Sequence, residues 1–276
     1  MRIFAVVLGL VALCGCGIDR DGAVSATIAH YDRGGQKDGL VVYLATKGDA
    51  AKLEQGKRAL LQRGGVDFLI LPDTHREGNK MVSESAAVGR DDFLTVRHER
   101  MAARARAFAE MMMRYDMKPS DLDPLPEITV LEQGEETVAG HAGTLYWIGP
   151  SDGADIGFVE IVLSRDAALA PVGRMFAKMI APTDAVPQDE AGREDPMAAA
   201  VSRLSAEGTV LRYARAERGR TVAEDLYRLT LVEKSWTDPA RFNLPVRSFD
   251  LEGLRSNQGT GTLFQGSDGF ERGDAI

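Results

Sequence analysis

The first part of the chain consists of short stretches in which apolar and polar residues alternate, and turn-forming residues separate these stretches. A period of two is typical of β-strands, and the Gly-Gly, Lys-Gly-Asp and Pro-Asp sequences between the stretches suit tight turns. The expected strands cover residues 25–31, 40–46, 51–55, 58–62, 66–71 and 80–84. Because these short strands follow one another closely, the pattern predicts antiparallel neighbours.

The hydrophobic period changes to that of a helix after residue 90. The apolar positions with helical spacing are Leu94, Met101, Ala105, Phe108, Met112 and Tyr115. Asp91 and Asp92 suit a helix N-terminus, and Lys118-Pro119 ends the pattern, so we expect one long helix here.

Strands and shorter helices alternate in the second half of the chain. We expect strands at residues 128–132, 144–148, 156–164, 209–215 and 226–234, and helices at 168–180 and 197–206. The order predicts an α+β fold built on an antiparallel sheet.

The N-terminus has the layout of a secretory signal. Arg2 precedes an apolar run over residues 3–13 that is too short to span a bilayer. The sequence Leu-Cys-Gly-Cys that follows resembles the bacterial lipoprotein cleavage box, with Cys16 as the lipid attachment point. The alternative is an ordinary signal peptide with two incidental cysteines. We divide the chain into a signal peptide (1–15), a tether (16–23), a folded domain (24–246) and a tail (247–276) that composition predicts to be disordered.

Charge and cysteine content exclude several classes of function. The formal net charge of −8 argues against nucleic-acid binding, which needs clustered lysine and arginine. Cys14 and Cys16 are the only cysteines, so the predicted domain has no disulfide, zinc-thiolate site or cysteine nucleophile. We expect no cofactor and no metal.

Two motifs that suggest enzymes lack the required context. Residues 149–153 match the G-x-S-x-G nucleophile elbow, but a strand rather than a helix is expected after Ser151, and the last histidine, His141, precedes it. The four histidines are scattered singly, without metal-ligand spacing. The sequence therefore predicts a protein that is not an enzyme.

Alternation along the strands predicts one continuous apolar face, completed by helix residues. The candidate lining residues of this face are Val42, Leu44, Phe68, Ile70, Leu145, Trp147, Val159, Ile161, Leu163, Tyr227, Leu229, Leu231, Phe108, Met112, Met175 and Met179. The face either holds an apolar ligand or is filled by the methionine-rich helices, and the sequence leaves both open.

Three segments resemble the Lol-type lipoprotein carriers of Gram-negative envelopes and related envelope proteins of unknown function. They are residues 66–73, residues 137–141 with 144–147, and residues 229–233 followed by the D-P-x-x-F-x-L-P sequence of 238–245. The resemblance implies a strongly curved antiparallel sheet, an incomplete β-barrel, with one long and one or two short helices packed into or over its concave face.

We therefore expect a non-enzymatic envelope lipoprotein that binds a lipid or acyl chain or assists envelope assembly. The alternative is a lipoprotein with a side-chain-filled barrel that binds a protein partner. Its N-terminal lipid would anchor it to a membrane of a Gram-negative envelope, with the folded domain in the periplasm. Gly17 after the cysteine, rather than aspartate, favours the outer membrane.

Overall fold

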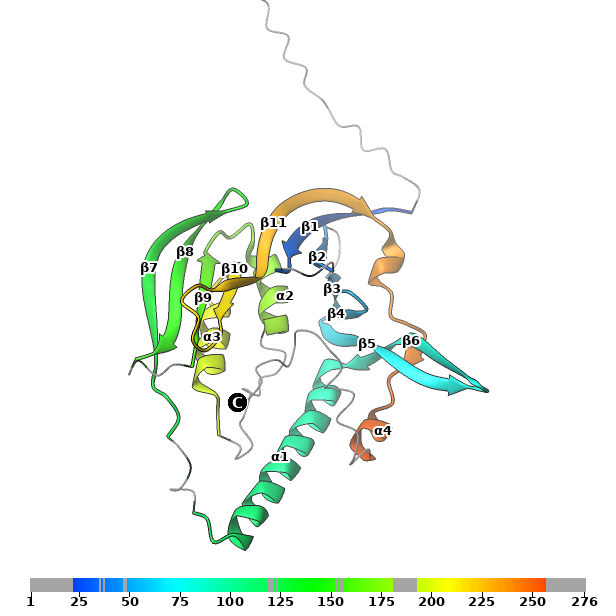
Figure 1. Cartoon of the computed structure of the whole chain (residues 1–276). Coiled ribbons are helices and arrows are strands. Elements are labelled where there is room, and N and C mark those ends of the chain that lie inside the picture. The colour runs from blue at the N-terminus through cyan, green and yellow to red at the C-terminus, as the bar shows by residue number, and fades with distance from the viewer. Residues whose placement is uncertain are drawn as a thin grey trace, which may run out of the picture.

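One large sheet and four α-helices make up the part of the chain that the computed structural model describes, which is residues 22–34, 36, 38–46, 49–118, 122, 124–151, 153, 156–180 and 193–256 (Figure 1). The strands are β1 (Val24–Asp32), β2 (Leu40–Ala45), β3 (Ala51–Gln55), β4 (Arg58–Arg63), β5 (Val66–Glu77), β6 (Lys80–Gly89), β7 (Ile128–Val138), β8 (His141–Pro150), β9 (Phe158–Ser164), β10 (Thr209–Ala216), β11 (Glu224–Thr237) and β12 (Arg247–Ser248). The helices are α1 (Arg90–Arg114), α2 (Ala170–Ile180), α3 (Pro196–Ser205) and α4 (Leu251–Ser256).

The sheet has the strand order β12-β6-β5-β4-β3-β2-β1-β11-β10-β9-β8-β7. Every neighbouring pair is antiparallel except β12 and β6, which are parallel. The first and last long strands of the chain, β1 and β11, meet in the middle, so the sheet joins two meanders. This architecture confirms the predicted α+β class and the open, incomplete barrel.

Ion pairs at one end of the sheet demonstrate its strong curvature. Arg212 of β10 binds Asp225 of β11 at 2.6 Å, Glu160 of β9 at 3.0 Å and Glu136 of β7 at 3.3 Å. Arg228 of β11 also reaches Glu136, at 3.4 Å. Three strands separate β7 from β11 in the sheet order, so these contacts require the sheet to curl sharply.

One face of the sheet, which we call the α2 face, carries the main hydrophobic core. Directly paired residues share a face, and the row Ala29, Val42, Leu53 and Leu60 runs across β1 to β4 on this side. Helices α2 and α3 join the same core through Val172, Phe176, Val201 and Leu204. Figure 1 shows α2 within the curve of the sheet.

The β5–β6 hairpin is longer than the sequence predicts, because Pro72 does not end β5. Strand β4 pairs with β5 only up to Ile70, whereas β6 pairs with β5 from Phe68 to Glu77. Pro72 lies where β5 has a neighbour on one side only, so its missing N–H interrupts no pairing with β4. The hairpin projects from the body of the molecule (Figure 1).

The segment that resembles D-P-x-x-F-x-L-P packs on the face opposite α2. Asp238 accepts a hydrogen bond from the Ala240 N–H at 2.8 Å and so begins the 3-10 helix Pro239–Phe242. Phe242 is buried beside Leu61 and Ile70. The motif thus covers the outer surface of β4 and β5.

The predicted disorder of residues 247–276 is wrong for its first part. β12 pairs with Ala86 and Ala87 of β6, and Phe249 contacts the ring of Phe93 at 6.4 Å between centroids. These contacts with distant strands and helices give order to a sequence that has few large apolar residues. Residues 257–276, like the predicted signal and Cys16, lie outside the described residues.

Within the described ranges, none of the helices combines the length and apolar character that crossing a membrane requires.

Candidate functional site

The aromatic side chain of Phe176 occupies the middle of the α2 face. Its ring stacks on Tyr31 of β1 with centroids 4.7 Å apart and meets Tyr227 of β11 edge-on at 5.6 Å. Its neighbours Val172, Met175 and Met179 are at most 4% exposed. Lys178 of α2 binds Asp67 of β5 at 2.6 Å, which ties the helix to the sheet. Helix α2 therefore fills the space in which the sequence predicts a ligand.

A buried polar cluster lies at the edge of this aromatic group. Arg33 is 7% exposed, and its guanidinium lies 5.7 Å from the ring centre of Tyr227. The amide oxygen of Gln55, which is also 7% exposed, accepts a hydrogen bond from Arg33 Nη1 at 2.9 Å. No carboxylate of the described residues pairs with Arg33, so an aromatic face and an amide stabilise this buried cation.

Sequence reasoning missed this cluster. Arg33 lies between Asp32 and Gly34, a polar context that indicates a surface turn. Only the pairing of β1 with β11 brings Arg33 close to Tyr227.

Burial also sets the chemistry of the tyrosines on this face. It raises the pKa of Tyr31 above its ordinary value, and burial is also the leading cause of the raised pKa of Tyr213 and Tyr227. The Tyr31 hydroxyl donates to the carbonyl oxygen of Val210 at 2.9 Å. The Tyr31 phenol is therefore a neutral hydrogen-bond donor within the core at physiological pH.

The structure brings ten of the predicted lining residues together in the core of the α2 face. Val42, Val159, Ile161, Leu163, Tyr227, Leu229, Met175 and Met179 are buried there, and Leu44 and Leu145 pack against them. They line the α2 face as the alternation predicts, but they contact protein side chains. A ligand-binding role for them stays a prediction.

Three predicted lining residues do not join this core. Phe68 and Ile70 pair with Leu61 and Ala59 and join the outer cluster around Phe242. Trp147 pairs with Glu160, and its neighbours Tyr146 and Ile148 are buried in the core instead. Both strands are apolar on both faces, so alternation alone does not identify the inner one.

Leu231 was predicted to line the α2 face, but a β-bulge turns it away from the core. Leu229 pairs with Tyr31, but Leu231 pairs with His30, so Thr230 is the extra residue. An extra residue reverses the alternation, and Val232 rather than Leu231 packs against the core. Leu231 is 47% exposed as a result.

Phe108 and Met112 do not belong to the α2 face either. They lie on α1, whose main contacts are with β5, β6 and α4. The beginning of α1 is buried where Phe93, Leu94 and Val96 pack with Val88, and Met112 near its end is also buried, at 6% exposure. Helices α2 and α3, rather than α1, cover the α2 face.

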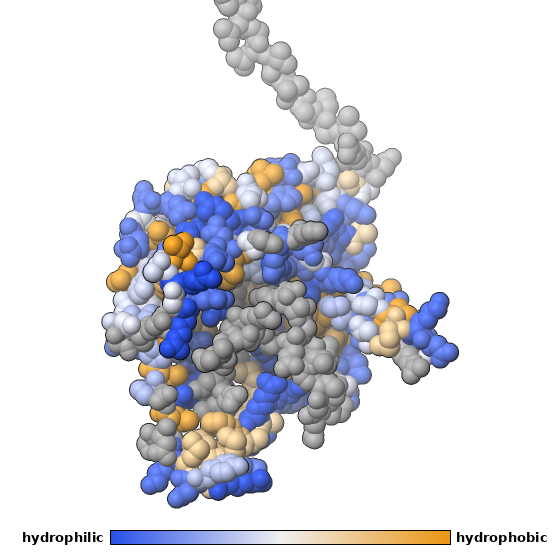
Figure 2. Space-filling model, viewed as in Figure 1, coloured by the Kyte–Doolittle hydropathy of each residue, from blue (hydrophilic) through white to orange (hydrophobic). Residues whose placement is uncertain are grey.

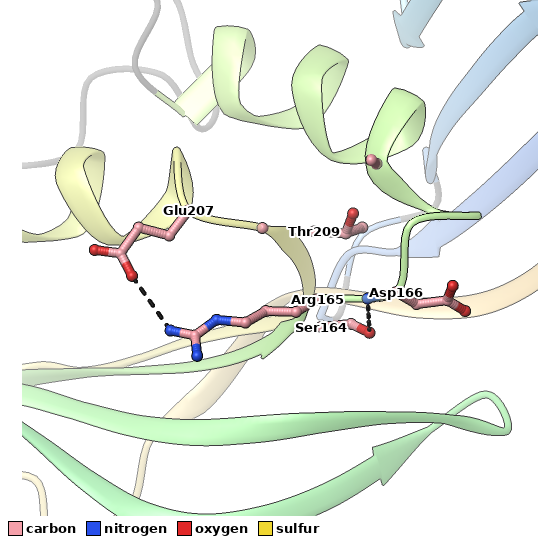
Figure 3. A pocket seen from close by; sticks show the side chains of 7 residues that line it. Ser164, Arg165, Asp166, Glu207 and Thr209 are labelled. Carbon is pink, nitrogen blue, oxygen red and sulfur yellow. Dashed lines mark hydrogen bonds and ion pairs between the residues drawn. The ribbon is translucent and has the colours of Figure 1, made fainter.

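A small hollow of about 210 Å³ lies where β9 leads into α2 (Figure 3). Its polar groups bind one another: Arg165 pairs with Glu207 at 3.5 Å, and Thr209 donates to the carbonyl oxygen of Leu169 at 2.9 Å. The Ser164 hydroxyl accepts from the backbone N–H of Asp166 at 3.3 Å. The hollow is smaller than a usual small-molecule site and is a polar joint between β9, α2 and β10.

The structure also places the residues of the two enzyme-like motifs. The Ser151 hydroxyl donates to the carbonyl oxygen of Glu127 at 3.2 Å, and the strand β9 follows the G-x-S-x-G sequence. His30 pairs with Glu233 at 3.5 Å, whereas His75 lies 2.8 Å from Arg247. Among the described residues, no three of His, Cys, Asp and Glu come together as metal ligands would.

Comparisons with known proteins find likenesses among solved structures only. No family model and no curated protein matches the sequence. A crystal structure of MucB is 14% identical, with a TM-score of 0.29, and the match covers 83% of this chain and 59% of that chain. A structure of the Pseudomonas aeruginosa MucA/MucB complex is 13% identical, with a TM-score of 0.30, and the match covers 82% of this chain and 57% of that chain. A DUF1329 family protein from Desulfovibrio piger is 15% identical, with a TM-score of 0.19, and the match covers 82% of this chain and 91% of that chain.

This chain thus spans less than two thirds of the MucB chains that it matches. TM-scores this low do not show a shared fold, and the Lol-type resemblance stays a prediction.

Proposed function

We propose that this chain is a non-enzymatic lipoprotein of the bacterial envelope whose half-barrel is filled by its own helix and which acts by binding a protein partner. The position of Phe176 supports partner binding over lipid binding, the two functions that the sequence left open. It is fully buried between Tyr31 and Tyr227, in the middle of the face that an acyl chain would occupy. Removing α2 from this face would expose a large apolar area, which is costly in water.

The filled half-barrel is tested with a fluorescent fatty acid. The full chain carrying Cys16→Ser is titrated with the probe, and albumin serves as the positive control. We expect no saturable binding, because α2 already covers the apolar residues of the sheet. Saturable binding that Ile161→Glu abolishes in a folded protein would overturn the filled-barrel proposal.

The same titration decides the second candidate function, in which α2 is a lid that an apolar ligand displaces. The observation in its favour is that the Lys178–Asp67 ion pair between α2 and β5 is partly open to water, which can replace it when the helix moves. Saturable binding would make this the better account. Val66→Ser, at a half-exposed position, is the matched control for Ile161→Glu.

The anchor is tested by fractionation. Cys16→Ser should move the protein from the membrane to the soluble fraction, because the thiol that accepts the lipid is gone. Cys14→Ser is the matched control and should remain with the membrane, since serine fits the cleavage box at that position. Separation of inner and outer membranes then tests the expected outer-membrane location.

A further inference from the structure

Trp236 is the more exposed of the two tryptophans, and it lies beside the point where the folded domain begins. It is 44% exposed on β11 and pairs directly with Ser25, the second residue of β1. Paired residues share a face, and the Ser25 hydroxyl lies 3.2 Å from the hydroxyl of Thr46, which follows β2. Trp236, Ser25 and Thr46 therefore form one row across the ends of three neighbouring strands, which we call the Trp236 rim.

The side chains of the Trp236 rim suit the boundary between lipid and water. The row itself is uncharged, and the charges around it, Lys234, Asp49 and Asp238, are mixed in sign. Figure 2 likewise shows apolar and polar residues intermixed over the upper part of the molecule, where Figure 1 places the start of β1 and the end of β11. Tryptophan combines a large apolar ring with an N–H group that prefers water, and it is enriched at membrane–water interfaces.

The position of Trp236, rather than its exposure, indicates what it contacts, because single exposed apolar side chains are ordinary on protein surfaces. Cys16, the predicted lipid attachment point, precedes Val24 by eight residues, which reach about 28 Å at most. The bilayer that holds this lipid would therefore lie within that distance of the start of β1. By contrast, α1 alone is about 37 Å long and extends to the opposite end of the molecule (Figure 1).

We propose that the Trp236 rim is a membrane-contact site, at which the Trp236 ring enters the headgroup–acyl boundary of the bilayer that holds the lipid anchor. The inference rests on the anchor of the proposed function and adds a second point of contact to it. Tethering makes this second contact intramolecular, so a weak contact is sufficient. The contact restricts rotation of the domain about its tether and directs the far end of α1 away from the membrane.

The test uses tryptophan fluorescence, because Trp147 and Trp236 are the only tryptophans of the chain. The lipidated full chain carrying Trp147→Phe, in which Trp236 is the single reporter, is reconstituted on vesicles of phosphatidylethanolamine and phosphatidylglycerol. Brominated acyl chains quench a tryptophan that touches them, and vesicles without bromine give the reference intensity. We expect the fluorescence of Trp236 to fall at least about twofold on the brominated vesicles, because interfacial tryptophans contact the acyl boundary.

The matched control places the reporter on the far edge of the sheet. Leu131 of β7 is 45% exposed, almost the same as Trp236, and three strands separate β7 from β11. Leu131→Trp, in a chain that also carries Trp147→Phe and Trp236→Phe, should keep its fluorescence on the same vesicles.

A second comparison is independent of Trp147→Phe, which removes a ring that contacts Phe158 at 5.9 Å between centroids. The quenching of the wild-type chain should be lost in Trp236→Phe, whose only tryptophan is Trp147. Circular dichroism confirms that each variant is folded.

Vesicle flotation separates the failure of this inference from the failure of the anchor. Lipidated protein that floats with the vesicles but shows no quenching at position 236, or equal quenching at position 131, would overturn the membrane-contact site and leave the lipoprotein proposal standing. Protein that carries no lipid on Cys16 by mass spectrometry and does not float would overturn the anchor, and the membrane-contact site with it.

Discussion

Helix α2 and the C-terminal end of α1 have the same kind of sequence and opposite surroundings. Both present methionine and aromatic residues at helical spacing. Met175 and Phe176 of α2 are 1% and 0% exposed, whereas Met113 of α1 and Tyr115, which follows its last turn, are 71% and 72% exposed. The sheet covers Met175 and Phe176 of α2, whereas Met113 and Tyr115 are open to water, although Met112 beside them is 6% exposed. Apolar residues at similar spacing thus do not by themselves show which side chains are buried.

The sharpest test of this contrast is the loss of a large side chain in each region. Phe176→Ala should lower the free energy of unfolding by about 3–5 kcal/mol, because it leaves a cavity between two tyrosine rings. Met113→Ala should change it by less than about 0.5 kcal/mol, since water already surrounds that side chain. Urea denaturation followed by circular dichroism measures both. Equal losses of unfolding free energy in the two variants would show that Phe176 and Met113 do not differ in burial as described.

The ion cluster that curls the sheet offers the next largest effect. Arg212→Ala should cost about 1.5–3 kcal/mol of unfolding free energy, because Asp225, Glu160 and Glu136 lose their shared cation in a partly buried place. The raised pKa of Arg212 fits this role: burial lowers it, but the hydrogen bond and charge of Asp225, helped by Glu136 and Glu160, outweigh the burial.

Arg165→Ala is the control for this cluster. Arg165 is 67% exposed and pairs with a single carboxylate, so its replacement should change the unfolding free energy by less than about 0.5 kcal/mol in the same urea titration. A comparable cost for both arginines would remove the argument that the cluster holds β7 against β11.

The base of α1 should respond locally. Phe249→Ala removes the ring that packs on Phe93 and should cost about 1–2 kcal/mol. Hydrogen exchange should then quicken in the first turns of α1 and remain unchanged in α2. Faster exchange in α2 as well would mean that the two regions unfold as one unit.

Alkaline pH gives the smallest and most specific test of the aromatic core. Burial raises the pKa of Tyr31 above the ordinary value of 10.0, so above pH 10 the unfolded chain loses this proton while the folded chain keeps it. The unfolding free energy therefore falls with rising pH, by about 1.4 kcal/mol per pH unit from this phenol alone. Below pH 10 both states hold the proton, and the phenol adds no pH dependence.

Tyr31→Phe should make that alkaline decline less steep, at the expense of about 1 kcal/mol at neutral pH for the lost hydrogen bond to Val210. Tyr115→Phe, at the exposed end of α1, should follow the wild-type curve. Urea titrations between pH 9 and pH 11.5 measure the slopes, and parallel curves for wild type and Tyr31→Phe would contradict the burial argument.

Most strands could be predicted from local sequence because alternation and turn residues are local properties. The third strand was predicted at its observed bounds, Ala51–Gln55, and the others overlap β1, β2, β4 and the core of β8 to β11. The second half of β7 was missed, because its glutamates and Gly134 suggest a loop. β7 is an edge strand, and one pairing with β8 is enough to order it.

The candidate site was predicted less well because its geometry depends on pairing between distant strands. Leu231 is displaced by one bulge residue, and Phe68 lies on a strand with two apolar faces. Arg33 gave no local signal, since its aromatic partner is almost two hundred residues away in the chain.

The sequence by itself determined the order of most strands and helices, the antiparallel α+β class and the lack of any cysteine after Cys16, because each depends on residue identity and local spacing. The tertiary structure alone decided which face of each strand is inside, that α2 fills the half-barrel, and that Met113 is exposed while Met112 beside it is buried. Those outcomes depend on strand register, a bulge and packing across the whole chain, and a one-residue shift in pairing exchanges the two faces of a strand.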